Sequence, residues 1–495
     1  MPPHFEQHTC TVRGMSDRAY VVVEDSQWNV NIDQADVDMI LERWENSSIG
    51  QYPDQGIYDL NAAAFGDPPD ELDDDPRIYI LWFDFGINSD GFFFYFDQYP
   101  EGTYPGFHSN ECEVLYMNCG HGPSPSGDYM LSVIAHEFEH QQHWLYDEDE
   151  LSWVDEGMAE LAMWFYGRPD QISAFNSAPD NSLVVWNGNW ADYIKTYLWS
   201  LYFYERYGGH PAVYDVVHEP LNSVAGYEAV LDTHGYTDDF ADAFANWTVA
   251  NFLDDPAIGD GRYGYLGDEL PPFNVSGTYN TYPTGGITRT VSHWAADYYR
   301  FEGFGEQQSV RLDFDGADGS GFAVFALRLD ADGPTQVLPV QIDPATQTGS
   351  VSVAGLDDPA DEVVLVVAKN SGSGATSYTF SGQDDPAAVE PAGEFAGDPD
   401  PALHGARLSA GPNPFLDELS LRFVSPSSAD AAITAEIFDA TGRRIRALAG
   451  QAASGVANLS WDGRDQSGRP VAPGIYLIKA GNGDEQAHTR VIRLE

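Results

Sequence analysis

Two histidines four residues apart, His136 and His140, constrain the middle of this chain more than any other feature. On a helix, residues at this spacing share a face, so both imidazoles can bind one metal ion. Glu137 lies between them and is placed to hold a water molecule and take its proton. Glu156, further along the chain, is the candidate for a third ligand. Three protein ligands leave the fourth tetrahedral position of Zn²⁺ open, so the sequence predicts a catalytic zinc site.

The residues around this motif favour a metal site over a plain helix pair. A bare His-Glu-x-x-His pattern is short, and the alternative is two buried helices with satisfied histidines and solvated carboxylates. Residues 130–135 are apolar, as expected of a helix that runs through a core. Residues 153–162 form a second amphipathic pattern, with Glu156 and Glu160 on one side. The combination of two histidines, two glutamates and this spacing favours the metal site.

Two segments of this region carry a family resemblance. HEFEH at 136–140 and WVDEGMAELA at 153–162 resemble the gluzincin metallopeptidases, the thermolysin-like group. The resemblance covers residues 16–270 and implies an α+β zincin-type domain with a mixed sheet, an active-site helix and a helical lobe. A closer likeness is to secreted bacterial peptidases with an HEFQH-type helix and a WxNEGLSE-type second helix. Two departures are a shorter interval between the second histidine and the downstream glutamate, and the absence of the Gly-x-Met-Glu-Asn signature of the aminopeptidase branch.

The resemblance assigns a role to each charged residue of the two segments. It implies zinc as the cofactor, bound by His136, His140 and Glu156, with Glu137 as the general base. It also implies that the carboxylate of Glu160 orients a ligand histidine.

The strand expected before the active-site helix, within residues 109–118, carries the predicted substrate contacts. In gluzincins this strand is the sheet edge along which an extended substrate lies, so the resemblance makes residues 111–117 the candidate for β-addition of a peptide. The predicted contact residues are Glu111, Glu113, Val114, Leu115 and Tyr116. Main-chain pairing fits any extended peptide and therefore predicts broad specificity. An aminopeptidase would instead need an acidic anchor for the substrate α-amine, which Glu111 or Glu113 could supply.

Aromatic residues crowd the helical patterns that follow Glu160. Related enzymes use a Tyr or His of this lobe to stabilise the tetrahedral oxyanion, which makes Tyr193 and Tyr197 catalytic candidates. The alternative for either tyrosine is packing in an aromatic core. His143, three residues past His140, is expected to form a wall of the site and not to bind the metal.

The charge of the chain is strongly negative. Lys and Arg number 23 against 78 Asp and Glu, which gives a net charge of −55. Such a surface repels nucleic acid and anionic membranes, so neither is expected as a partner. An acidic, solubilising surface accounts for this composition. Ca²⁺ binding in the Asp-rich turns at 67–75, 315–318 and 330–332 is an alternative that no EF-hand pattern supports.

Three cysteines exclude a disulfide-dense scaffold. Cys112 and Cys119 flank an apolar run and would lie too far apart to pair on a straight strand, so a bridge from Cys10 to either is the expected pairing.

No apolar run approaches the length of a membrane-spanning helix. The N-terminus has neither a basic segment nor an apolar segment of a signal peptide, so a truncated start or an omitted signal is expected.

The composition predicts a multidomain chain in five parts. These are an N-terminal α/β lobe (1–128), the active-site helix and helical lobe (129–270), a β-sandwich (271–382), an acidic Pro-rich linker (383–404) and an Ig-like C-terminal domain (405–495). In the first lobe, residues 18–24 and 77–83 are expected to be strands, and residues 36–45 an amphipathic helix.

The last part has a signature of its own. The elements NPF (413–415), DATGR (439–443), WDGRD (461–465) and PGIY (473–476) occur in that order. They resemble the C-terminal sorting tail of type IX-secreted bacterial proteins and the related Ig-like domain of flagellar hook-capping proteins. The resemblance implies export to the bacterial cell surface or medium, with the secretion machinery as a partner. The alternative is an ordinary adhesion-type β-sandwich.

The sequence therefore predicts a secreted, monomeric zinc endopeptidase that acts on protein or peptide substrates. The alternatives are a zinc aminopeptidase and a surface-displayed binding protein whose peptidase fold is inactive. The intact pattern around Glu137 favours an enzyme, because a pure binding protein could lose this residue at little cost.

Overall fold

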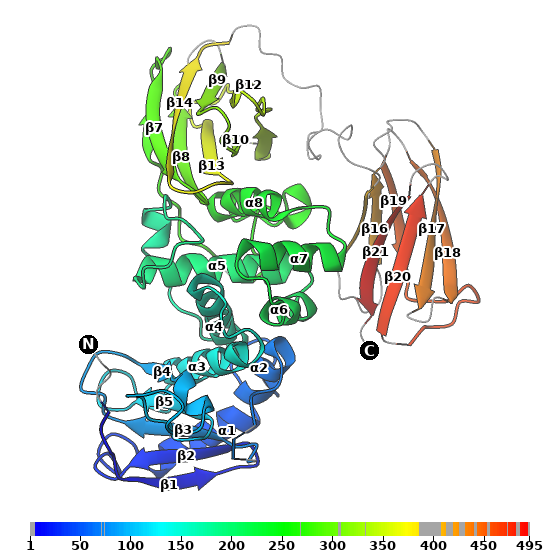
Figure 1. The fold of residues 1–495 in the computed structure, drawn as a ribbon. Coiled ribbons are helices and arrows are strands. Elements are labelled where there is room, and N and C mark those ends of the chain that lie inside the picture. Colours follow the sequence, from blue (N-terminus) through cyan, green and yellow to red (C-terminus); the bar gives the residue numbers. More distant parts are fainter. Residues whose placement is uncertain are drawn as a thin grey trace. The chain divides into compact units, whose positions relative to one another are not determined.

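The computed structural model describes residues 5–385, apart from 71, 74, 268, 305–307 and 332. In the C-terminal part it describes residues 407–411, 419–424, 431–439, 443–452, 456–472, 474–481 and 486–493. Contacts divide the chain into two units, Met1–Gly393 and Glu394–Glu495 (Figure 1). The chain is a multidomain, mixed α/β protein with several sheets. The predicted linker at 383–404 lies almost wholly outside the described residues.

A five-stranded mixed sheet forms the N-terminal lobe. Its order is β1-β2-β3-β5-β4, from β1 (Cys10–Met15), β2 (Ala19–Glu24), β3 (Ile78–Phe83), β5 (Val114–Asn118) and β4 (Gly91–Phe93). Strands β2, β3 and β5 are parallel, and β1 and β4 run antiparallel to their neighbours. The strands predicted at 18–24 and 77–83 are β2 and β3.

The predicted edge strand is wrong in position and in length. β5 begins at Val114, because residue Glu111 turns the chain with a φ of 53° before the strand starts. β5 is also paired on both sides, to β3 and to β4, so it has no free edge for a substrate. The edge is β4, a three-residue strand that the sequence analysis did not identify. The antiparallel direction of β4 arises because the chain folds back after β3.

Four helices accompany this sheet: α1 (Gln34–Glu45), α2 (Ile57–Phe65), α3 (Asp128–Tyr146) and α4 (Ser152–Tyr166). α1 begins where Asp33 caps it, since its side chain accepts the backbone N–H groups of Ala35 and Asp36. Buried amides hold α3 against α2: Asn61 donates to the Ala135 carbonyl at 2.8 Å. The two helices α3 and α4 carry the predicted zinc motif.

A helical lobe follows, from α5 (Trp190–Arg206), α6 (His210–Val217), α7 (Val224–His234) and α8 (Phe240–Leu253). Short 3₁₀ turns lie at η1 (Tyr95–Gln98), η2 (Phe175–Ser177) and η3 (Gly259–Gly261). Aromatic side chains dominate the core of this lobe, where Trp199 packs against Tyr227, Phe240 and Trp247. Helices α3 to α8 therefore share one continuous core with the sheet of the first lobe.

Two antiparallel-rich sheets follow the helical lobe. One has the order β11-β10-β13-β8-β6 and the other β12-β9-β14-β7. Their strands are β6 (Gly277–Tyr279), β7 (Ile287–Ser292), β8 (Ala295–Glu302), β9 (Ser309–Gly316), β10 (Phe322–Leu329), β11 (Gln336–Pro339), β12 (Thr348–Ala354), β13 (Glu362–Lys369) and β14 (Ala375–Gln383). A second hydrophobic core, with Tyr299, Phe314 and Phe380, fills these strands.

The C-terminal unit contains two further sheets, β15-β16-β19 and β18-β17-β20-β21. The strands are β15 (Arg407–Gly411), β16 (Leu419–Val424), β17 (Ala431–Asp439), β18 (Arg444–Ala452), β19 (Val456–Trp461), β20 (Gly474–Gly481) and β21 (Gln486–Arg493). Trp461 is fully buried, and its indole N–H donates to the Arg464 carbonyl at 2.9 Å. The NPF element at 413–415 lies outside the described residues, as do residues 440–442 and 473.

The expected disulfide is absent, because Cys10, Cys112 and Cys119 are all free thiols. Burial raises the pKa of the Cys112 and Cys119 thiols to about 12, so neither is a reactive thiolate at neutral pH. Within the described part of the chain, no helix combines the length and the apolar character needed to cross a bilayer.

Candidate metal centre

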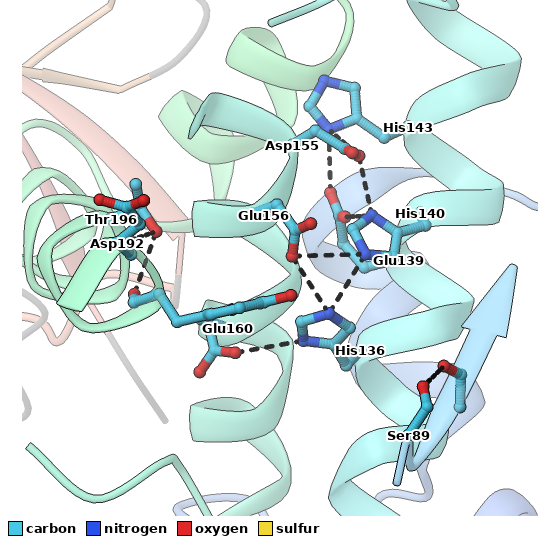
Figure 2. A network of polar contacts seen from close by, with 12 residues as sticks. Ser89, His136, Glu139, His140, His143, Asp155, Glu156, Glu160, Asp192 and Thr196 are labelled. Atoms are coloured by element: carbon cyan, nitrogen blue, oxygen red, sulfur yellow. Dashed lines mark hydrogen bonds and ion pairs between the residues drawn. The ribbon is translucent and has the colours of Figure 1, made fainter. Parts of the chain in front are cut away.

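Helices α3 and α4 lie side by side and present the motif residues to each other (Figure 2). α3 runs through the core, and almost every residue from Met130 to His143 is buried. Gly157 of α4 lets the next helix approach closely, since an added Cβ would lie 2.6 Å from Ser200 Oγ and 3.0 Å from the Thr196 carbonyl oxygen. α5 therefore packs directly against α4.

Three ligand atoms converge between the two helices. His136 Nε2 and His140 Nε2 lie 3.1 Å apart. Glu156 Oε2 lies 3.5 Å from the first and 3.8 Å from the second. Tetrahedral zinc with ligand distances of about 2.0–2.1 Å would separate its ligand atoms by about 3.3 Å, so these distances match a zinc site. The side chains of His136, His140 and Glu156 keep 11, 15 and 17% of their surface exposed, so solvent reaches the site.

The carboxylates that face the two imidazoles favour a cation at this point. His140 Nδ1 lies 2.9 Å from Asp155 Oδ1, and His136 Nδ1 lies 3.4 Å from Glu160 Oε1. If each Nδ1 carries the ring proton toward its carboxylate, both Nε2 atoms present lone pairs to each other. Glu156 Oε2, buried and without a hydrogen-bond donor among the described residues, adds a third electron-rich atom. A bound divalent cation would satisfy all three atoms.

Glu137 lies beside this group of ligands and against the edge strand. Its side chain is 6% exposed. A Cβ added at Gly91 of β4 would lie 3.0 Å from Glu137 Oε1, so the carboxylate touches the strand backbone. Burial raises the pKa of Glu137, and the nearby His136 and His140 oppose that rise. A carboxylate in this position can exchange a proton between the ligand group and a chain paired to β4.

Tyr193 and Tyr197 have different surroundings, although they share a face of α5. The ring centroid of Tyr193 lies 6.5 Å from that of His136, and the side chain is half-buried. Burial, and then the charge of Glu156, raises the pKa of the Tyr193 phenol, which keeps the hydroxyl protonated as a donor. Tyr197 is fully buried in the core and lines a cavity next to Asp170. The structure therefore brings Tyr193 to the ligands and places Tyr197 one helical turn away.

A second polar group lies behind His140, and the sequence alone did not indicate it. It consists of Glu139, His143 and Asp155 (Figure 2). His143 Nδ1 lies 3.1 Å from Glu139 Oε1 and 3.7 Å from Asp155 Oδ1. Burial lowers the pKa of His140, but Asp155 outweighs burial and raises it to about 10 in the metal-free chain, so a bound zinc would displace the proton from Nε2. His143 is buried and lies outside the group of His136, His140 and Glu156. The four-residue spacing of Glu139 and His143 on a helix was the sequence pattern that could have indicated this pair.

The residues predicted to bind substrate on β5 are held elsewhere. Glu111 lies before the strand, where its carboxylate accepts the Glu101 backbone N–H at 2.9 Å. Glu113 is 1% exposed, and both of its carboxylate oxygens lack a partner among the described residues. Val114 and Leu115 are core residues. Tyr116 is buried with a hydrogen bond to Asp97 at 2.5 Å, so none of the five offers an open contact to a peptide.

Two groups of histidine and acidic side chains in the described part of the chain have ligand atoms close enough together to hold a metal ion. The groups with suitable spacing are His136, His140 and Glu156, and then Glu139, His143 and Asp155. Calcium binding in the Asp-rich turns stays a prediction.

A comparison with known protein families identifies the type of domain in the C-terminal part of the chain. Residues 416–485 match the FlgD Ig-like domain family, so the chain carries an Ig-like domain of this type at its C-terminus. No curated protein sequence matches the chain.

Among solved structures, PorZ, a surface component of the type-IX secretion system of Porphyromonas gingivalis, is 21% identical over 18% of this chain and 11% of that protein, with a TM-score of 0.14. Latent PorU from Porphyromonas gingivalis is 16% identical over 45% of this chain and 19% of that protein, with a TM-score of 0.19. The chain thus spans less than a fifth of the length of either protein.

Proposed function

We propose that this chain is a zinc-dependent peptidase that cleaves internal peptide bonds. The convergence of two imidazole nitrogens and a carboxylate oxygen beside Glu137 carries the proposal. The mixed sheet with an antiparallel edge strand, followed by the two motif helices, supports a zincin-type fold for this region. His136, His140 and Glu156 would hold the zinc. A bound zinc supplies a Lewis acid that polarises a carbonyl and lowers the pKa of a water molecule.

Residues around the zinc site would then have separate roles in peptide hydrolysis. An extended substrate pairs its main chain with the outer edge of β4, which places a peptide carbonyl next to Glu137. Glu137 takes a proton from water as the water oxygen bonds to the carbonyl carbon. The C–N bond then breaks, and Glu137 passes that proton to the leaving amine. The Tyr193 hydroxyl donates to the oxygen that carries the negative charge between these steps.

The supporting residues fix the two histidines in place. Asp155 accepts from His140 Nδ1 at 2.9 Å, and Glu160 faces His136 Nδ1 at 3.4 Å. Each contact sets which nitrogen of the ring is free to bind metal and restricts rotation of the ring. An endopeptidase is favoured over an aminopeptidase, because the acidic anchors proposed for an α-amine, Glu111 and Glu113, are engaged in a loop and buried.

We also propose that the C-terminal domain directs the chain to the bacterial cell surface or medium through a type IX secretion machinery. The Ig-like domain at 416–485 and the ordered elements that resemble sorting tails support this assignment. Deletion of residues 405–495 in a bacterium with that machinery should leave the chain inside the cell. Export of the truncated chain would contradict this part of the proposal.

Cleavage of casein by wild type and Glu137→Gln tests the enzymatic proposal. Both proteins should contain zinc, and only the wild type should cleave, because the amide cannot take a proton from water. Glu42→Gln, at an exposed position of α1, is the matched control and should cleave as the wild type does. A zinc-loaded wild type that cleaves neither casein nor a peptide library would favour a binding protein instead.

A further inference from the structure

A cavity lies at the junction of three segments, one of which is the helix α5 that also carries Tyr193. The loop after α4 supplies residues 169–172, α5 supplies Tyr197, and the segment after α8 supplies residues 269–272. The cavity has a volume of about 480 Å³ and opens to solvent. This volume lies within the roughly 300–1,000 Å³ of small-ligand sites in proteins.

One carboxylate on the cavity wall has an unusual environment. Asp170 is 8% exposed, and no hydrogen bond or ion pair to it occurs among the described residues. Burial, and then the charge of Glu160, raises the pKa of Asp170 to about 7. The cation on the same loop, Arg168, donates to the Pro169 carbonyl at 2.8 Å and lies over the Tyr129 ring, and its charge offsets only part of the rise in the pKa of Asp170. A buried carboxylate without a partner is costly, and a cationic ligand would offset that cost.

Helix α5 links the cavity to the ligand residues. Tyr193, beside His136, and Tyr197, on the cavity wall, are four residues apart on this helix. One helical turn separates such residues by about 5.4 Å. The charge of Glu160 raises the pKa of Asp170 and that of His136 lowers it, so these groups lie within electrostatic range of the carboxylate. A side chain of a peptide held at the metal could therefore extend into the cavity.

We propose that this cavity is a specificity site for a Lys or Arg side chain of the substrate, next to the cleaved bond. The inference rests on the proposed peptidase function and names its substrate class. Asp170 would pair with the ammonium or guanidinium group, and Glu269 at the exposed rim would guide it inward. Ile172 and Leu270, both half-buried, would pack against the aliphatic stem. The net charge of −55 attracts cationic peptides to the molecule as a whole.

Cleavage-site mapping with a peptide library tests the inference. The wild type should cleave peptides with Lys or Arg at one fixed position relative to the bond at least about tenfold better than matched peptides with norleucine there. Asp170→Asn should remove most of this preference while it keeps cleavage of the norleucine peptides. Asp170→Glu, which retains the charge, should keep a preference for basic peptides. Asp232→Asn, at an exposed position of α7, is the matched control for the lost charge and should behave as the wild type.

Peptide binding provides a second measurement that does not depend on turnover. The Glu137→Gln variant, loaded with zinc, should bind a fluorescent Lys peptide at least about tenfold more tightly than its norleucine counterpart, and addition of Asp170→Asn should abolish the difference. Cleavage without a basic preference, or a preference that Asp170→Asn leaves intact, would overturn the specificity site and leave the peptidase standing. No cleavage of any peptide, with equal binding of both peptides, would overturn both.

Discussion

His140 Nδ1 lies 2.9 Å from Asp155 Oδ1, while His140 Nε2 lies 3.1 Å from His136 Nε2. One ring thus connects the half-buried carboxylate of Asp155 to the point where the proposed zinc ligands meet. The carboxylate fixes the proton on Nδ1 and leaves Nε2 as a lone pair for the metal. Because α3 carries the histidines and α4 carries Asp155 and Glu156, the packing of these two helices determines the geometry of the site.

Loss of a ligand histidine should remove the zinc. His140→Ala takes away one of three protein ligands, and two ligands do not hold a structured zinc site. Metal analysis of the purified variant should find a small fraction of the one zinc per chain expected in the wild type. His121→Ala, at an exposed position, is the control and should keep its zinc. Full zinc content in His140→Ala would contradict the ligand assignment.

Asp155 should control zinc affinity without being a ligand. Asp155→Ala removes the acceptor of the His140 Nδ1 proton, and such supporting residues typically change metal affinity by about 10–100-fold. A competitive chelator titration should show that loss, with zinc still bound at saturation. Asp38→Ala, exposed on α1, should leave the affinity unchanged. An unchanged affinity in Asp155→Ala would show that packing alone orients the ring.

Tyr193 should act on the rate and not on substrate binding. Tyr193→Phe removes a hydroxyl that burial keeps protonated, and loss of one donor to an oxyanion costs roughly a hundredfold or more in kcat. Steady-state kinetics on one peptide should show this fall with KM and zinc content little changed. Tyr214→Phe, whose side chain is 40% exposed, controls for loss of a phenol hydroxyl. A parallel rise in KM would indicate that Tyr193 packs against the substrate instead.

Glu113 should make the fold less stable as the pH rises. Burial raises the pKa of Glu113 to about 7, well above that of the same residue in an unfolded chain. The folded chain therefore holds a proton that the unfolded chain has lost, and stability declines between about pH 4.5 and 7. At pH 8 the free energy of unfolding of Glu113→Gln should exceed that of the wild type by on the order of 2–3 kcal/mol. At pH 4 the two proteins should be equally stable.

Denaturant unfolding at the two pH values checks this prediction. Glu111→Gln, in the exposed turn just before the strand, is the control and should show no such gain at pH 8. A Glu113→Gln variant that is less stable than the wild type at pH 8 would mean that the carboxylate has a partner in solution.

Local patterns predicted most of the helices and the first strands. Val37, Ile40 and Trp44 are buried at helical spacing in α1, and the alternating burial of β2 and β3 follows their apolar residues. The edge strand β4 could not be predicted this way, because three residues carry no period. The free cysteines also required the structure, since the distance between chain segments decides whether thiols can pair.

The candidate site was predictable in part for a similar reason. The sequence spacing of His136 and His140 predicts that they share one face of a helix, with Glu156 on the next helix. The structure brings these three residues together. The role of Asp155 was not visible, because only the rotation of α4 against α3 turns its carboxylate to His140 Nδ1. The sequence did not distinguish the roles of Tyr193 and Tyr197. The packing of α5 places Tyr193 near His136 and Tyr197 on the cavity wall.

Anomalous scattering at the zinc K edge, from crystals of the wild type grown with zinc, tests the central claim most directly. The account predicts one strong peak within about 2.0–2.2 Å of His136 Nε2, His140 Nε2 and a Glu156 carboxylate oxygen. Crystals of His140→Ala should lack it. The absence of a peak in the wild type, or a peak held only by Glu139, His143 and Asp155, would contradict the proposed metal centre.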